Sequence, residues 1–342
     1  MTQAARADVA VPKLANVTIL ATGGTIAGTG ATSTTTVGYT AATVGVQRLI
    51  QAVPELAKVA NVTGEQVFQI ASENMSNEHW LILAKRVNVL LAQPNVDGIV
   101  ITHGTDTLEE TAYFLNLVVK SRKPVVLVGA MRPSTALSAD GPINLYNSVL
   151  LAASPEAAGK GVLVAMNDQI QAARDITKVN TSTLDAFRTP DLGMLGYIQG
   201  SKAFFYRQQL RKHTVDTEFD ISALQVLPQV DIVYGYANVG PVAVDALVAS
   251  GSKGIIHAGV GDGSLAAKVV PALKAARAKG ALVVRASRVG QGILARNGEA
   301  NDDELDFVVA DTLNPQKARI LLMLALTKTT STKEIQRMFY AY

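Results

Sequence analysis

The 342-residue chain contains no cysteine and only four histidines. Without cysteine it can form no disulfide, thiol nucleophile or cysteine-ligated metal site, and this composition fits either the cytoplasm or the periplasm. The histidines have no recognisable mutual spacing, and no G-x-S-x-G elbow is present. The sequence therefore predicts neither a serine hydrolase nor a metalloenzyme, and it calls for no cofactor.

Long apolar runs and long basic runs are also missing. No apolar stretch reaches the roughly 18 to 20 residues that a membrane-spanning helix needs. The 31 basic and 28 acidic residues are scattered and leave a net charge of +3. We therefore expect neither a membrane nor a nucleic acid as partner.

What the chain does have is apolar content, at 48%, arranged as strands that alternate with helices. This pattern predicts an α/β fold, with a larger N-terminal domain around a mainly parallel, doubly wound sheet and a smaller α/β domain at the C-terminus. We divide the chain into residues 1–206, an interdomain linker at 207–229, and residues 230–342. Within it we expect loop or hairpin at 167–205, a helix at about 264–279, and a last helix at 315–327.

One strand-to-helix junction carries unusual polar residues. The apolar run that starts at Gly98 turns at His103-Gly104 and continues at helical spacing from Leu108, with Thr105, Asp106 and Thr107 between. Threonine and aspartate are ordinary helix N-caps, so capping alone accounts for them about as well as a site does.

A second junction of the same kind favours a site. The strand at 16–21 leads directly into Thr22-Gly-Gly-Thr-Ile-Ala-Gly28, so two junctions each present a threonine. In an open parallel sheet such junctions lie together at the carboxyl edge, where ligands bind. The glycine spacing matches neither G-x-G-x-x-G nor the P-loop pattern, which argues against nucleotide binding.

A threonine hydroxyl needs an adjacent base before it can act as a nucleophile. Lys178 and Tyr39 come from loops that we expect to overhang the same edge. Each has an ordinary alternative, since most lysines are exposed charges and a loop tyrosine is often an anchor. His103 is a third candidate, although a histidine between a strand end and a glycine is more often packed than catalytic.

At this point the residues suggest a family. The chain resembles the bacterial type II L-asparaginases, including the glutaminase-asparaginases, from about Leu14 to Tyr342. The resemblance rests on T-G-G-T-I-A-G at 22–28, I-T-H-G-T-D-T-L-E-E-T-A at 101–112, A-M-R-P-S-T at 130–135, S-A-D-G-P at 138–142, M-N-D at 166–168 and L-N-P-Q-K-A-R-I-L-L at 313–322.

The resemblance implies a flavodoxin-like smaller domain and a set of catalytic residues. It makes Thr25 the nucleophile, with Tyr39 beside it, and makes Thr105, Asp106 and Lys178 a second group. It further implies that the smaller domain of a neighbouring subunit supplies a carboxylate, for which Glu299 is the match. The implied reaction forms an acyl-enzyme on Thr25 and releases ammonia, after which water releases the acid.

Substrate recognition follows from the same resemblance. Asp106 and Glu73 would accept from the α-ammonium group, and Ser72 with backbone amides around Gly104 would donate to the α-carboxylate. Glu73 stands where stricter asparaginases carry Gln, and Ser264 stands where some carry Asn. Both differences predict hydrolysis of L-glutamine as well as the preferred L-asparagine.

The resemblance also implies a homotetramer of two intimate dimers and a periplasmic location. Residues Met1–Asp8 lack the apolar core of a signal peptide, so we expect a leader to have been removed already. Two alternatives stay open. One is a non-catalytic amino-acid-binding protein of the same fold, and the other is a cytoplasmic type I asparaginase.

Overall fold

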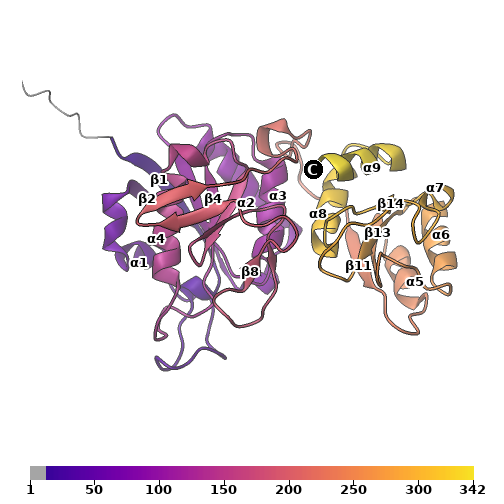
Figure 1. Ribbon diagram of the computed structural model, residues 1–342, viewed down its shortest axis with the longest axis horizontal. Helices are drawn as coiled ribbons and strands as arrows, with labels where there is room; N and C mark the ends of the chain where they lie inside the picture. Colours follow the sequence, from indigo (N-terminus) through magenta and orange to yellow (C-terminus); the bar gives the residue numbers. More distant parts are fainter. Residues whose placement is uncertain (1–12) are drawn as a thin grey trace, which may run out of the picture.

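The computed structural model describes residues 13–342, which form two main sheets with helices on both faces and a small two-stranded sheet (Figure 1). The larger sheet has eight strands in the order β10-β9-β6-β5-β4-β3-β1-β2. These strands are β1 (Ala15–Gly23), β2 (Ala60–Ile70), β3 (Gly98–Thr102), β4 (Val125–Val128), β5 (Val162–Met166), β6 (Gln169–Ala172), β9 (Gly196–Gln199) and β10 (Lys202–Phe205).

The centre of this sheet is parallel and fully buried. Strands β2, β1, β3, β4 and β5 pair in parallel, and every residue of β3 is inaccessible to solvent. Ile99 and Ile101 belong to the core on one face, whereas Val100 belongs to the core on the other, because successive side chains of a strand alternate. A continuous apolar run is what a strand covered on both faces requires.

Four helices cover the two faces of the larger sheet. The helices α2 (Asn77–Leu91) and α3 (Leu108–Val118) pack on the face of Ile99, and α1 (Val46–Gln51) and α4 (Gly141–Ala152) pack on the face of Val100. The expected doubly wound arrangement is confirmed.

The segment 167–205 is more ordered than the sequence suggests. Strands β6, β9 and β10 extend the larger sheet by antiparallel pairing, and β7 (Thr177–Lys178) pairs with β8 (Phe187–Arg188) in a separate two-stranded sheet. These strands are two to four residues long. Such short segments show no clear periodicity, which is why only a loop or hairpin was predicted.

The smaller sheet is entirely parallel, in the order β11 (Val230–Tyr234), β12 (Gly254–Gly259), β13 (Leu282–Ser287) and β14 (Val308–Val309). Its helices are α5 (Val242–Ala249), α6 (Val270–Ala278), α7 (Asp302–Leu305), α8 (Pro315–Ala325) and α9 (Thr332–Ala341). Two expectations were wrong here, because α6 begins only at Val270 and α8 is followed by a further helix, α9. Pro271 near the start of α6 suits a helix N-terminus and accounts for the late start.

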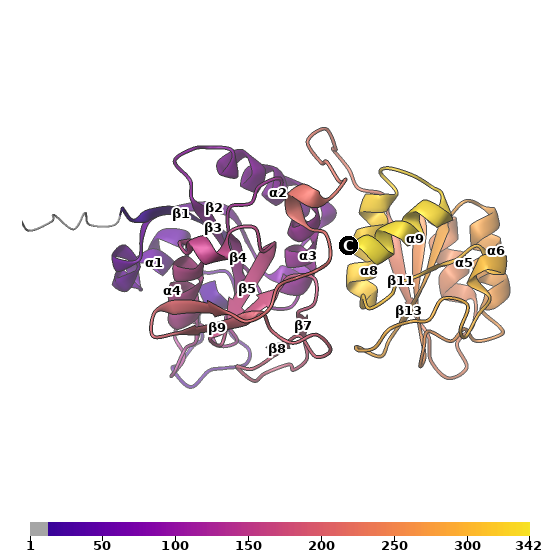
Figure 2. The ribbon, with the colours of Figure 1, turned by 45° about the horizontal axis from the view of Figure 1, so that its top comes forward.

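Helix α8 lies between the two sheets (Figures 1 and 2). It packs against β11 and β12 on one side and against α3 on the other, so one apolar cluster runs through both parts of the molecule. Between the last strand of the larger sheet and the first of the smaller one the chain is irregular, except for a 3-10 turn at Thr214–Asp216. Phe219 and Ile221 of this connection are buried in the shared cluster. The fold class is confirmed, while the boundaries at 206 and 230 stay a prediction.

Within residues 13–342, no helix combines the length and the apolar character that crossing a membrane requires.

Candidate active site

Loops that follow β1, β2 and β3 meet at the carboxyl edge of the larger sheet, as parallel pairing of these strands requires. They enclose a cavity of about 490 Å³. Its walls include six residues named from the sequence as catalytic or substrate-binding on these loops: Thr25, Tyr39, Ser72, Glu73, Thr105 and Asp106. Lys178 on β7 and the backbone of Gly104 complete this part of the wall.

Close packing of two glycines brings the threonine loops together. A Cβ on Gly24 would lie 2.3 Å from both the Cα and the N of Gly104, so only glycine allows this approach. Gly24 also has a φ of 81°, in the region that favours glycine. Thr25 follows directly in a 3-10 turn and is 7% exposed. The glycines of the first motif thus serve the contact between loops.

Thr25 is hydrogen-bonded to Tyr39, with 2.7 Å between the two hydroxyl oxygens. Tyr39 stands near the end of the exposed loop 29–40, whose two ends are joined by backbone hydrogen bonds between Thr29 and Thr40. The Gly30 N–H donates to the Thr135 hydroxyl at 2.8 Å, which fixes the loop to the segment after β4. The loop therefore covers the cavity from one side and presents Tyr39 to Thr25.

The second threonine belongs to a separate polar group. Lys178 Nζ donates to Thr105 Oγ1 at 2.9 Å and to Asp106 Oδ1 at 2.6 Å. Thr105 is 5% exposed, whereas the Asp106 side chain is 62% exposed. We call Thr25 with Tyr39 the Thr25 pair, and Thr105 with Asp106 and Lys178 the Thr105 triad.

Ser72 and Glu73 come from the 3-10 turn at Ser72–Asn74 that follows β2. Ser72 is buried against Gly104, and its carbonyl accepts a hydrogen bond from the Thr107 hydroxyl at 2.8 Å. Glu73 is exposed on the cavity wall. Both residues line the same cavity as Thr25 and Thr105.

His103 lies away from the cavity. Its ring is fully buried, with Nδ1 hydrogen-bonded to the Gly104 carbonyl at 2.7 Å and Nε2 to the Thr111 hydroxyl at 2.9 Å. Burial lowers the pKa of His103 to about 4, although the bond to the Gly104 carbonyl opposes the shift. A neutral, fully hydrogen-bonded ring is a packed histidine, so the structure does not support His103 as the base.

Ser264 and Glu299 lie together in the smaller domain, outside the cavity. The Ser264 hydroxyl donates to Glu299 Oε2 at 3.0 Å, and neither residue lines the wall around Thr25. Glu299 is exposed. The two residues therefore form a polar pair outside the cavity that holds this chain's own threonines.

Other residues of the cavity wall were not singled out from the sequence. Met131 and Arg132 come from the A-M-R-P-S-T segment, and Thr181 and Ser182 come from the loop after β7. Met131 and Arg132 belong to a motif that carries the family resemblance, and this membership could have identified them. The second two lie in an exposed polar loop, and nothing in their local sequence distinguishes them.

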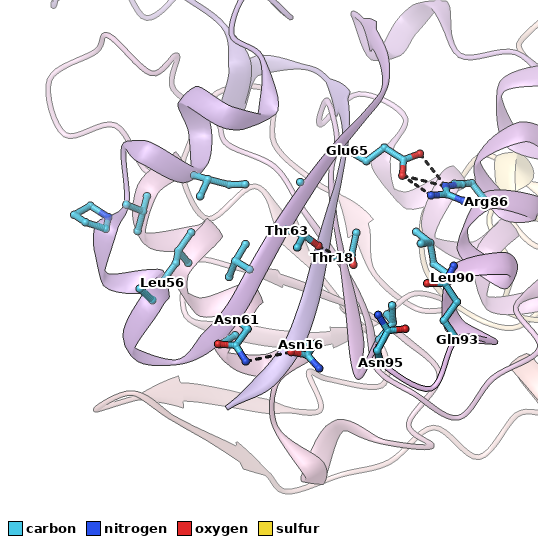
Figure 3. A pocket seen from close by; sticks show the side chains of 18 residues that line it. Asn16, Thr18, Leu56, Asn61, Thr63, Glu65, Arg86, Leu90, Gln93 and Asn95 are labelled. Atoms are coloured by element: carbon cyan, nitrogen blue, oxygen red, sulfur yellow. Dashed lines mark hydrogen bonds and ion pairs between the residues drawn. The ribbon is translucent and has the colours of Figure 1, made fainter. Parts of the chain in front are cut away.

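A more voluminous cavity, of about 1060 Å³, lies at the free edge of β2 (Figure 3). It contains the Glu65–Arg86 ion pair and the hydrogen bond between Asn16 and Asn61. None of the residues proposed from the sequence lines it. Over residues 13–342, no three His, Asp or Glu side chains are grouped as metal ligands.

Comparison with known proteins gives matches along nearly the whole chain. Residues 16–211 match the family model described as asparaginase, N-terminal, and residues 229–339 match the glutaminase/asparaginase C-terminal domain. A glutaminase-asparaginase of Pseudomonas fluorescens biotype A is 56% identical over 96% of this chain and 91% of its own. A probable periplasmic L-asparaginase of Haemophilus influenzae is 50% identical over 95% of this chain and 93% of its own.

A solved structure also matches nearly the whole chain. The crystal structure of a probable cytoplasmic L-asparaginase from Campylobacter jejuni superposes with a TM-score of 0.94 at 52% identity, covering 96% of this chain and 100% of the other.

Proposed function

The chain belongs to the type II bacterial asparaginase family, and on this premise we propose that it hydrolyses L-asparagine to L-aspartate and ammonia, with appreciable hydrolysis of L-glutamine. The observation that carries the proposal is that the Thr25 pair and the Thr105 triad share one cavity. Two hydroxyls, each with its own polar partner, suit a reaction in two stages.

In the first stage Thr25 Oγ1 attacks the side-chain amide carbon, while the Tyr39 hydroxyl accepts the proton that Thr25 loses and passes its own proton to the departing amide nitrogen. The C–N bond breaks, ammonia leaves, and the acyl group stays on Thr25 as an ester. The 2.7 Å bond between the two hydroxyls supports this role for Tyr39. Backbone N–H groups near Thr25 and Thr105 would stabilise the negative charge on the carbonyl oxygen.

In the second stage a water molecule near the Thr105 triad attacks the ester and releases the acid. The contacts of Lys178 with Thr105 and Asp106 support an ordered polar surface for that water. Asp106 and Glu73 would accept from the substrate's α-ammonium group, and Ser72 would donate to its α-carboxylate. The exposure of Asp106 and Glu73 on the cavity wall agrees with contact to a charged ligand.

The test is ammonia release from L-asparagine and L-glutamine by the parent and by Thr25→Ala, Thr25→Ser and Thr105→Ala. We expect the alanine variants to lose activity by about three orders of magnitude or more, and Thr25→Ser to keep part of it because a hydroxyl remains. An inactive parent that still binds aspartate would refute catalysis and favour the amino-acid-binding alternative.

We further propose that Ser264 and Glu299 complete the cavity of a neighbouring subunit in a homotetramer. Their contact with one another, away from this chain's cavity, supports a role toward another copy. Mixing inactive Thr25→Ala subunits with inactive Glu299→Ala subunits should then restore part of the activity, because a mixed dimer has one intact site. A monomer with full activity in sedimentation would contradict the proposal.

The relatives' names differ on compartment, since one is called periplasmic and another cytoplasmic. We propose the periplasm, and cell fractionation of the source organism tests it. A sigmoidal dependence of rate on asparagine would favour the cytoplasmic type I enzyme instead.

A further inference from the structure

Buried charged side chains lie behind Lys178 and have no part in the reaction described above. Glu109 on α3 is 4% exposed, and Lys317 on α8 is 2% exposed. Burying a charge is costly unless it is well hydrogen-bonded. The hydrogen-bond partners of these two side chains therefore indicate which parts of the structure they stabilise.

Glu109 links the backbone of Lys178 to the start of α8. Its Oε2 accepts from the Lys178 N–H at 2.8 Å. Its Oε1 accepts from Asn314 Nδ2 at 3.2 Å and from the side-chain amide of Gln316. One carboxylate on the larger domain therefore binds the lysine's main chain and two side chains of the smaller domain.

Lys317 holds the segment that leads into Lys178. Its Nζ donates to the Arg174 carbonyl at 2.8 Å and to the Ile176 carbonyl. Burial lowers the pKa of Lys317 to about 8, and the charges of Glu109 and Asp175 oppose that shift. The carbonyl two residues before Lys178 and the N–H of Lys178 itself are thus each bound to a buried charge.

Upstream of Lys178, Arg174 and Ile176 are buried, and Arg174 donates to the Tyr342 carbonyl and to Thr312. Lys178 itself is only half-buried, and regular strand pairing does little to fix it. Lys178 lies on the two-residue strand β7, which pairs only with the two-residue strand β8 and stands apart from the main sheet. A two-stranded pair of that length is not stable by itself. The contacts of Glu109 and Lys317 with this segment therefore contribute to the position of Lys178 Nζ beside Thr105.

We propose that Glu109 and Lys317 are positioning residues that hold Lys178 against Thr105, and that α8 thereby makes the Thr105 triad depend on the smaller domain. The proposal deepens the proposed function and rests on the role given there to Lys178. An ordinary interdomain contact is the alternative, and it would stabilise the fold without acting through Lys178.

A double-mutant cycle distinguishes positioning of Lys178 from an ordinary interdomain contact. We expect Lys317→Met and Glu109→Gln each to lower kcat about ten- to a hundredfold, because a shift of about 1 Å in a catalytic group has that effect. The affinity for aspartate should fall less than kcat does, since Ser72 and Glu73, two of the three side chains proposed to bind the substrate's α-substituents, lie on another loop. In a Lys178→Met background neither change should lower kcat further, since residues that act through the same group are not additive.

The chain offers a matched control. Lys123 Nζ also donates to two main-chain carbonyls, of Leu91 at 2.9 Å and Gln93 at 2.7 Å, away from the cavity. Lys123→Met should leave kcat unchanged. If Lys317→Met does not fold, Gln316→Ala removes one bond to Glu109 from a half-buried position and should lower kcat less but with the same dependence on Lys178.

Three results would overturn the proposal: parental kcat in both Lys317→Met and Glu109→Gln, a further loss of kcat in the Lys178→Met background, or an equal loss in Lys123→Met. A different result would contradict the proposed function. If Lys178→Met itself keeps the parental kcat, the role of Lys178 in catalysis is refuted.

Discussion

The Thr25 pair and the Thr105 triad face one cavity but are held in place by different kinds of structure. Thr25 rests on a glycine-to-glycine contact, and its partner Tyr39 comes from an exposed loop rich in hydroxyls. The Thr105 triad is held by buried charges and by a helix of the second domain. The first arrangement lets Tyr39 reach the site from a surface loop, whereas the second holds the backbone of Lys178 from within the core.

The Thr25 pair and the Thr105 triad also differ in the titratable residues near them in the sequence. Residues 17–38, which lead to Tyr39, contain no charged residue and no histidine. The segment around Thr105 has His103 and Glu110 close by, both with pKa values shifted by burial. Changes in pH should therefore act on the Thr105 side more than on the Thr25 side.

The largest effect should come from a change of Gly24, whose contact with Gly104 brings the loops of Thr25 and Thr105 together. Gly24→Ala places a methyl group against Gly104 at a positive φ, so we expect a loss of about 3 kcal/mol or more in stability and a large loss of activity. Gly38→Ala is the control, since its φ is also positive but nothing lies within 4 Å of the added methyl. It should cost only about 1 kcal/mol in thermal unfolding. Equal losses of stability in the two variants would mean that the positive φ, and not the contact between the loops, causes the loss.

Tyr39→Phe tests the exposed partner of Thr25. We expect kcat to fall about a hundredfold, equivalent to about 2.7 kcal/mol, with little change in melting temperature, because the hydroxyl that relays the proton is lost but packing is kept. Tyr146→Phe, which removes a hydroxyl bonded to Ser201 away from the cavity, should have no effect on kcat. A Tyr39→Phe enzyme with parental kcat would contradict the role of this hydroxyl.

The pH dependence of stability should differ between variants on the Thr105 side. Burial lowers the pKa of His103 to about 4, so between pH 4 and 6.5 the unfolded chain binds more protons and stability rises with pH. Burial raises the pKa of Glu110 to about 7, partly opposed by Arg319, so between pH 4.5 and 7 stability falls with pH. In the parent the two contributions oppose one another.

Glu110→Gln should therefore lose stability more steeply than the parent on acidification from pH 7 to 4.5. We expect a difference on the order of 2 kcal/mol in denaturant unfolding across that range. His103→Gln should change the slope in the opposite direction. Parallel curves for all three proteins would show that these groups titrate alike in the folded and unfolded chains.

The smallest effect concerns substrate choice. Glu73→Gln should lower the ratio of kcat/KM for glutamine to that for asparagine by about three- to tenfold, since a pocket change of this size is worth about 1 kcal/mol. Glu78→Gln is the control, because Glu78 is exposed on the same stretch of chain but faces a different hollow. An unchanged ratio in Glu73→Gln would remove Glu73 from the account of specificity.

The fold followed from the sequence where elements were long and regular. Buried runs such as Gly98–Thr102 and the helical spacing after Leu108 predicted the parallel sheet and its covering helices, because periodicity reports burial directly. The strands between 169 and 205 and the helix α9 were not predicted. The strands are too short to show a period, and α9 begins only a few residues after α8, so its start was not distinguished from a C-terminal extension.

The sequence by itself determined which residues could carry the chemistry. Two strand-to-loop junctions with a threonine each, and the resemblance that they support, led to Thr25, Tyr39, Thr105, Asp106 and Lys178. These choices depend on residue type and local order, which any single chain displays.

Only the tertiary structure decided how these residues are held and which others hold them. Glu109 and Lys317 are far apart in the sequence, and their common contact with the segment of Lys178 exists only because α8 packs on α3. The same holds for the burial that shifts the pKa values of His103 and Glu110. Contacts between distant segments and the local exclusion of water arise from packing, and sequence order does not contain them.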